Sequence, residues 1–210
     1  MIEKFLKYAC SGMFSDELDK MGYRNQVIDG LRTNNPGGKI YGMARTVKLE
    51  TIETDDENIR EGLGFLGKLE KGEILCVEAS SKFAYFGELM SRLSIRQGLG
   101  GIVIGGLTRD GFFTHKLDNL TVYSEGYSPR DIKGRGRVQA TDVDIAVKGL
   151  KIRPGDWIFA DMDGIVVIPK EARCELEKRI DDIISNEGNI ISDINNGVTV
   201  AEILNRYKEF

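Results

Sequence analysis

The chain has 210 residues, of which 41% are hydrophobic and 30% charged, and this composition excludes a disordered protein. Its net charge of -4 argues against general nucleic-acid binding, which uses a surplus of basic residues. No apolar run is long enough to span a bilayer, and the first residues lack the uninterrupted apolar core of a signal peptide. We therefore expect one globular, cytoplasmic domain over residues 1–210, with neither membrane nor nucleic acid among its partners.

The amino-terminal third alternates helical and extended patterns. Its predicted elements are a helix over 2–9, a short helix from 15 to about 22, an irregular stretch over 23–35, one or two strands over 39–50, and a helix over 57–69. Ser15 is the expected N-cap of the second helix. Residues 62–68 fit the first seven positions of a P-loop, but Leu69 replaces the hydroxyl that binds magnesium. A P-loop also follows a strand and opens a helix, so we reject a nucleotide site here.

Two strands, a helix and a third strand are predicted in close succession in the middle of the chain. They lie at 73–78, 84–86, 89–97 and 102–104. Met90, Leu93 and Ile95 are candidates for the buried side of the helix, which glycines end. Arg109 and Asp110 follow the third strand at its carboxyl end, where open α/β sheets tend to bind ligands.

Glu88 opens this helix, and the twenty residues between Glu88 and Arg109 form the helix and the returning strand. The return can bring Glu88 beside Arg109 and Asp110. Two carboxylates and a guanidinium at one end of the sheet could hold a divalent cation and an anionic substrate together. The alternative is a carboxylate at a helix start beside an exposed structural ion pair.

Extended segments dominate after residue 122, and helices finish the chain. The predicted elements are an extended segment at 122–127, a turn at 128–131, a basic loop at 133–137, a strand at 144–152, hairpin strands at 157–160 and 165–168, a helix over 170–186, and two shorter helical pieces around Gly197. The basic loop should be solvated, although its charge could steer an anion toward a site. Asp161 and Asp163 are assigned to a hairpin turn in which Asp-Gly takes positive backbone angles.

The cysteine and histidine inventory restricts the chemistry. Cys10, Cys76 and Cys174 lie far apart, without the spacing of a zinc site or a disulfide framework, so we expect reduced thiols. His115 is the only histidine, which excludes a two-histidine metal site within one chain. No nucleophile motif surrounds it, and we expect an ordinary surface or loop histidine. A metal here should be bound by oxygen, which favours magnesium or manganese over zinc.

The sequence resembles the RraA-like family, which contains RraA regulators of ribonuclease activity and 4-hydroxy-4-methyl-2-oxoglutarate aldolases. The resemblance covers nearly the whole chain. It is carried by Ser-Asp-Glu-Leu at 15–18, residues 38–47, Gly-Glu-Leu at 87–89, Gly-Gly-Leu-Thr-Arg-Asp at 105–110, Pro-Gly-Asp-Trp at 154–157 and residues 161–169. It implies a single α/β domain of the swivelling β/β/α type, phosphohistidine-domain-like, with amino- and carboxyl-terminal helices. The helical tail covers about 170–210, and the chains are expected to form a homotrimer or hexamer.

The resemblance also implies a metal site. The family's aldolases carry an acidic residue, twenty residues and then Arg-Asp, and Glu88, Arg109 and Asp110 satisfy this pattern. By this resemblance Asp110 binds Mg²⁺ or Mn²⁺ directly, whereas Glu88 contacts the metal through water. Glu187 of a neighbouring subunit is expected to do the same.

Substrate-binding positions follow from the same comparison. Arg109 and Glu88 are the expected catalytic residues. Arg109 and Gly87, together with the backbone N–H groups of Leu89 and Met90 at the helix start, are expected to bind a 2-oxo acid.

The implied activity is that of a class II, metal-dependent lyase. Retro-aldol cleavage of a 4-hydroxy-2-oxo acid and decarboxylation of oxaloacetate both produce the enolate of pyruvate, so one site could perform both. Glu88 stands where many members have aspartate, which leaves the substrate open. The alternative is a non-catalytic regulator that binds a ribonuclease. We reject a methyltransferase because no glycine-rich loop for the methyl donor follows a first strand.

Overall fold

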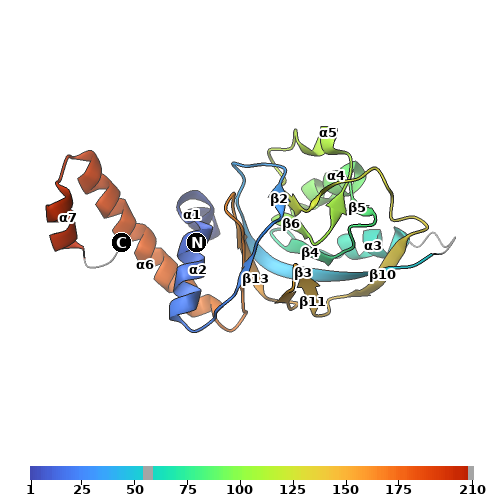
Figure 1. Cartoon of the computed structure of the whole chain (residues 1–210), viewed down its shortest axis with the longest axis horizontal. Helices are drawn as coiled ribbons and strands as arrows, with labels where there is room; N and C mark the ends of the chain where they lie inside the picture. Colours follow the sequence, from blue (N-terminus) through green and yellow to red (C-terminus); the bar gives the residue numbers. More distant parts are fainter. Residues whose placement is uncertain (54–58, 208–210) are drawn as a thin grey trace.

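The computed structural model describes residues 1–53 and 59–207, and it has the mixed α/β architecture predicted from the sequence (Figure 1). The helices are α1 Ile2–Tyr8, α2 Ser11–Lys20, α3 Ile59–Leu66, α4 Glu88–Gln97, α5 Gly111–Thr114, α6 Arg173–Asn195 and α7 Val200–Arg206. The strands are β1 Val27–Ile28, β2 Arg32–Thr33, β3 Ile40–Thr51, β4 Ile74–Glu78, β5 Ala84–Phe86, β6 Gly101–Ile104, β7 Leu107–Thr108, β8 Val122–Ser124, β9 Gly126–Tyr127, β10 Gly136–Thr141, β11 Ile145–Val147, β12 Leu150–Ile152, β13 Trp157–Ala160 and β14 Ile165–Ile168. Within these described residues no helix is long and apolar enough to cross a membrane.

The long strand β3 joins the two halves of the large sheet, whose order is β1-β14-β13-β3-β4-β6-β8-β2. Residues 40–43 pair antiparallel with β13, and residues 44–48 pair parallel with β4. The carboxyl end of β3 also pairs with β10. Strands β4, β6 and β8 are parallel and almost completely buried, as expected of parallel strands covered on both faces.

Helices cover the two ends of this sheet differently. At one end α1, α2 and α6 pack against β13 and β14 through an aromatic core that includes Phe5, Phe14, Tyr41 and Phe159. At the other end α3 and α4 pack over β4 and β6. In Figure 1, α6 and α7 extend away from the sheet at the end opposite α4 and α5.

A second, smaller sheet forms the edge on which the candidate site lies. Its order is β5-β7-β9, and all three strands are parallel. Ala84 pairs with Leu107, and Phe86 with Thr108. Because β5 leads into α4 and β7 leads into α5, the parallel pairing places the starts of these two helices side by side.

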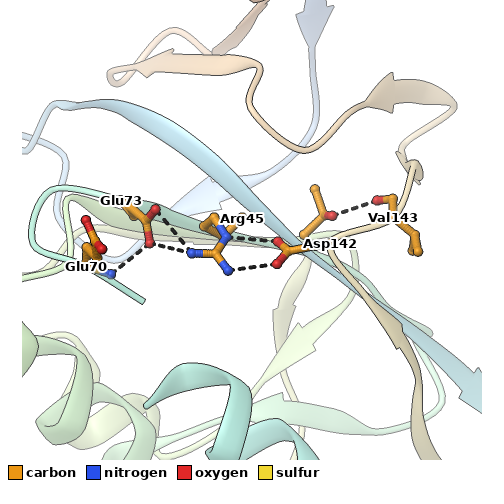
Figure 2. A network of polar contacts seen from close by, with 6 residues as sticks. Arg45, Glu70, Glu73, Asp142 and Val143 are labelled. Carbon is orange, nitrogen blue, oxygen red and sulfur yellow. Dashed lines mark hydrogen bonds and ion pairs between the residues drawn. The ribbon is translucent and has the colours of Figure 1, made fainter. Parts of the chain in front are cut away.

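A polar network around Arg45 ties three segments of the large sheet together (Figure 2). The Arg45 guanidinium donates to both carboxylate oxygens of Asp142, at 2.9 and 2.7 Å, and to Glu73 at 3.0 Å. Glu73 also accepts from the backbone N–H of Glu70 at 2.7 Å. The network fixes β3 against the turn that enters β4 and against the segment that leads to β11.

The start of α2 differs from the prediction because its cap comes from elsewhere in the chain. The helix begins at Ser11, and Ser15, the predicted N-cap, lies inside it. The N–H and hydroxyl of Ser11 donate to the buried carboxylate of Asp161 at 2.8 and 2.7 Å. Asp161 lies 150 residues away, so no local pattern could show this cap.

Two predicted features of the β-rich segment are also corrected. Residues 144–152 form a hairpin rather than one strand, because Lys148 and Gly149 take φ values of 51° and 86° in the turn. The hairpin at 161–164 forms as predicted, but Gly164 does not have a positive φ. Its turn is held instead by the Asp163 N–H, which donates to Asp161 at 3.0 Å.

The carboxyl-terminal helices also differ from the prediction. Helix α6 runs to Asn195, so it replaces both the predicted 170–186 helix and the first shorter piece. Asn186 and Gly188 are weak helix formers, but buried Ile190 and Ile203 show that packing between α6 and α7 outweighs their preference. Of the predicted helix 57–69, residues 57 and 58 lie outside the described residues.

Helix α4 buries a different set of residues than expected. Its fully buried side chains are Ser91 and Ser94, whose hydroxyls donate to backbone carbonyls one turn earlier at 2.9 and 2.8 Å. The predicted apolar side chains, Met90, Leu93 and Ile95, pack against the core but are only half buried.

Candidate functional site

A cavity of about 170 Å³ lies where the small sheet meets α3 and α4. Its lining comes from α3, the end of β5, the start of α4, the segment after β7, and the segment at 131–138. The lining residues are Gly62, Leu63, Tyr85, Gly87, Glu88, Leu89, Met90, Arg109, Asp110, Asp131, Ile132, Lys133, Gly136 and Val138. The six candidate residues between 87 and 110 thus line one pocket.

The predicted return of the chain brings Glu88 to Asp110. The backbone N–H of Glu88 donates to Oδ2 of Asp110 at 2.8 Å. The Glu88 side chain turns to Arg92, one helical turn later, and pairs with its guanidinium at 2.7 Å. Both carboxylates are about 40% exposed, so they can contact a ligand in the pocket.

The backbone of Asp110 is in an unusual conformation. Its φ and ψ are 58° and 40°, in the left-handed region that aspartate and asparagine enter more readily than most residues. This conformation precedes α5 and turns the carboxylate toward the start of α4. The side chain therefore accepts from Glu88 rather than capping its own helix.

Arg109 lies between two carboxylates. Its Nη1 is 2.8 Å from Oδ2 of Asp131, and its Nε is 3.7 Å from Oδ2 of Asp110. Its backbone N–H donates to the carbonyl of Phe86 at 2.9 Å, which fixes Arg109 to the end of β5. The guanidinium is about a third exposed and faces the pocket.

The start of α4 offers unpaired backbone donors. The N-cap residue, Gly87, has no side chain that could cap the helix, and within the described residues the N–H groups of Leu89 and Met90 have no hydrogen-bond partner. The Leu89 side chain is 74% exposed, whereas Met90 packs on the core. Such N–H groups, with the positive end of the helix dipole, form a favourable place for a carboxylate.

Gly87 allows this close approach. A Cβ atom at this position would overlap Oδ2 of Asp110 and lie 2.8 Å from Cγ of Arg109. Its φ of -149° is ordinary extended backbone, so the requirement for glycine is one of space. Gly87 therefore lets the acid and the guanidinium lie directly against the backbone that opens α4.

Tyr85 and Lys133 line the pocket although the sequence did not single them out for the site. The Tyr85 hydroxyl is buried and has no hydrogen-bond partner within the described residues. Burial raises the pKa of Tyr85, so its hydroxyl stays protonated at neutral pH. Lys133 belongs to the basic loop that was expected to be solvated, with a charge that could also steer an anion, and it lines the pocket.

The carboxylates fit a hydrated, oxygen-liganded cation. Magnesium is commonly bound by one or two protein carboxylates and retains several waters, and Asp110 and Glu88 supply such oxygens. Among the residues described, no group of three or more histidine, cysteine, aspartate or glutamate side chains forms a metal site. The donor set therefore suits a site completed by water, and it does not suit a zinc centre of histidines and cysteines.

Other predicted residues lie away from the pocket. Glu187 is on α6, at the opposite end of the fold from α4 and α5 (Figure 1), so within one chain it does not join them. His115 follows α5 and is exposed, with its ring centroid 5.3 Å from that of Tyr127. Asp131 had been assigned only to a turn, and nothing in its neighbours indicated that it contacts Arg109.

Comparison with known proteins identifies the family of this chain. The model of the RraA-like family, described as Aldolase/RraA, matches residues 12–167. The chain belongs to the RraA-like family. The matched range includes every residue that lines the pocket.

Individual relatives have different names within this family. The chain is 33% identical over 152 residues to a protein of Alkalilimnicola ehrlichii named "Putative 4-hydroxy-4-methyl-2-oxoglutarate aldolase", covering 68% of this chain and 89% of that protein. It is 25% identical to Protein DlpA of Legionella pneumophila over 94% of this chain, but it spans only 32% of DlpA. The crystal structure of Streptomyces coelicolor RraAS2, described as an unusual member of the RNase ES inhibitor RraA protein family, superposes with a TM-score of 0.76 at 25% identity, covering 89% of this chain and 91% of that one.

Proposed function

We propose that this chain is a divalent-metal-dependent lyase that releases pyruvate from a 4-hydroxy-2-oxo acid by retro-aldol cleavage and also decarboxylates oxaloacetate. The observation that carries the proposal is the meeting of Glu88, Arg109 and Asp110 at one pocket, beside N–H groups of α4 that have no partner among the described residues. The aldolase names of relatives support the same reaction class.

The pocket can orient a 2-oxo acid through its carboxylate. The N–H groups of Leu89 and Met90 point from the start of α4, and they bind the carboxylate in our proposal. Gly87 keeps the backbone close enough for Arg109 to contact the same end of the substrate. Asp110 would hold Mg²⁺ or Mn²⁺ directly, with Glu88 acting through water.

Arg109 stabilises the charge that develops during cleavage. Breaking the bond between C3 and C4 leaves an electron pair that moves to the oxygen on C2, forming an enolate. The bound cation would supply Lewis-acid stabilisation of this charge. Arg109 adds a fixed donor there, and loss of one such donor typically costs about 3–4 kcal/mol, or several hundredfold in rate.

The proposed site also includes a residue from a neighbouring chain. We propose a homotrimer or hexamer in which Glu187 of a neighbouring chain approaches the pocket. The exposed apolar side chains of α6 and α7, among them Ile191, Ile194 and Leu204, support contact between chains.

The test is a pyruvate-release assay on purified protein. The protein is stripped with a chelator, and each of several 4-hydroxy-2-oxo acids and oxaloacetate is assayed with and without added Mg²⁺ or Mn²⁺. Reactions without protein but with the same metal correct for the metal-catalysed decarboxylation of free oxaloacetate. We expect metal-dependent turnover that Asp110→Asn abolishes. Full turnover of stripped protein in excess chelator would contradict metal dependence.

The likeness to RraAS2 supports a second candidate function, inhibition of a ribonuclease by direct binding. Such a regulator needs its surface and not the pocket chemistry. Inhibition of RNase ES by wild type and Asp110→Asn alike, without pyruvate release by either, would favour this second function.

A further inference from the structure

Asp131 is a pocket carboxylate that the proposed function does not use. It comes from the segment before β10, whereas Arg109 and Asp110 follow β7. Its Oδ2 is 2.8 Å from Nη1 of Arg109, and its side chain is 37% exposed. The ion pair thus leaves the carboxylate open to the pocket that both residues line.

The small sheet fixes the position of Asp131 relative to Arg109. Asp131 forms a parallel bridge with Ala84 on β5, and the Ala84 N–H donates to the carbonyl of Arg130 at 2.7 Å. Arg109 is held by the last residue of the same strand, Phe86. Because β7 and the Asp131 segment both pair with β5, this strand holds the Arg109 and Asp131 side chains next to each other at the pocket.

A retro-aldol reaction needs a group that accepts the proton of the 4-hydroxyl. Among the described residues that line the pocket, Arg109 and Lys133 are cations and the Tyr85 hydroxyl is protonated, so none of the three is a base at neutral pH. Three carboxylates remain, and all three have a polar partner, but two of them already have roles at the cation in the proposed function. Asp110 accepts from the backbone of α4 and is the assigned cation ligand, and Glu88 pairs with Arg92 along its own helix.

We propose that Asp131 is the general base of the retro-aldol reaction, an inference that rests on the proposed function. Its carboxylate takes the proton from the 4-hydroxyl, and the bond between C3 and C4 breaks as the C4–O bond becomes a carbonyl. The released electron pair forms the enolate at C2, which the Arg109 guanidinium contacts. Asp131 then returns the proton to C3, so that pyruvate and the carbonyl fragment leave and the carboxylate is restored.

Decarboxylation of oxaloacetate distinguishes a general base at Asp131 from a residue that only positions Arg109. Oxaloacetate loses CO₂ from its C4 carboxylate, so no hydroxyl proton has to be removed before the bond breaks. The enolate is the same, and it takes its C3 proton from water. A base at Asp131 therefore matters for retro-aldol cleavage only, whereas a residue that merely orients Arg109 matters for both reactions.

The experiment compares wild type with Asp131→Asn, which keeps the shape and the acceptor for Arg109 but not the basic carboxylate. A 4-hydroxy-2-oxo acid that the wild type cleaves and oxaloacetate are assayed with Mg²⁺, and pyruvate binding is measured by calorimetric titration. We expect the retro-aldol kcat to fall by about a hundredfold or more. Oxaloacetate decarboxylation should change by less than about threefold, and pyruvate should bind no more weakly. Asp144→Asn, which neutralises a carboxylate paired with Lys151 on the β11–β12 hairpin, is the matched control for charge.

Two results would overturn the inference: a parallel fall in both reactions with weaker pyruvate binding, or an unchanged retro-aldol rate. Asp131→Ala with added formate is a second variant, and the small carboxylate should restore retro-aldol turnover several-fold without accelerating decarboxylation. Wild type that releases pyruvate from neither substrate would instead refute the proposed function itself, and this outcome does not depend on any variant.

Discussion

The backbone N–H of Glu88 and the Asp110 carboxylate, 22 residues apart, are joined by a hydrogen bond of 2.8 Å. The bond crosses between the two helix starts that follow β5 and β7. It uses Oδ2, the oxygen that also lies closest to Arg109. We therefore propose that Oδ1, which this hydrogen bond does not use, would be the oxygen available to a cation.

Asp110→Asn is expected to lose metal binding while the fold is retained. Asparagine tolerates the left-handed backbone of this position, so the change isolates the charge better than alanine would. Calorimetric titration with Mn²⁺ should show affinity reduced by more than about tenfold, since even residues that contact a metal indirectly contribute 10–100-fold. Glu88→Gln should give a smaller loss. Mn²⁺ binding by Asp110→Asn as tight as that of wild type would show that another residue is the ligand.

Arg109→Lys should retain metal binding but lose most turnover. Lysine keeps the positive charge but not the planar pair of donors that can contact carboxylate and enolate oxygens together. The loss should appear mainly in kcat, because the interaction strengthens as the enolate forms. Steady-state kinetics measures kcat, and a calorimetric Mn²⁺ titration of the same variant measures metal affinity. Normal kcat in Arg109→Lys would remove Arg109 from the catalytic step.

Mixed assemblies test whether a site is shared between chains. Arg109→Ala and Glu187→Ala proteins should each be impaired, because each lacks one residue of the shared site. Mixing and reassembling them should restore part of the activity, since some pockets then combine an intact Arg109 with a neighbour's intact Glu187. Light scattering gives the assembly state in parallel. A monomer of 23.4 kDa at micromolar concentration, or no recovery after subunit exchange, would contradict the shared site.

Much of the site could be predicted because its residues are local to two chain segments. The Gly87-Glu88 and Arg109-Asp110 pairs lie at the ends of a helix and a strand, and such connections have few geometric solutions. Asp131 could not be found in this way. It reaches Arg109 only through the pairing of a third segment with β5, and a turn-like sequence does not show where its side chain points.

The fold, too, could be predicted where local sequence determines it and could not where distant residues do. Buried strands such as β6 and the β13–β14 hairpin follow from their apolar runs. Two features depend on residues that are distant in sequence: the Asp161 cap on Ser11 and the continuation of α6 past Gly188. Local preferences therefore predicted a different helix start and an earlier helix end. The swivelling-domain assignment and the trimer remain predictions from family resemblance.

Tyr85→Phe should stabilise the free protein or leave its stability unchanged. Within the described part of the chain the hydroxyl is buried without a partner, and removing such a group relieves a desolvation cost of about 1–3 kcal/mol. Tyr41→Phe is the matched control, because the Tyr41 hydroxyl is 2.7 Å from the buried Glu177 carboxylate. That variant should lose about 1.5–3 kcal/mol of unfolding free energy.

Chemical denaturation of both tyrosine variants, followed by circular dichroism, measures the difference. If Tyr85→Phe lost as much stability as Tyr41→Phe, the Tyr85 hydroxyl would have a structural partner after all.

The lack of space at Gly87 has a consequence for sorting related sequences. Any side chain at this position would push the Asp110 carboxylate and the Arg109 side chain away from the start of α4. A relative that keeps the Arg-Asp pair but replaces this glycine could not retain the same arrangement, however similar the rest of its sequence. A glycine at this position is therefore a simple marker of members that can form the same arrangement of acid and guanidinium against the helix start.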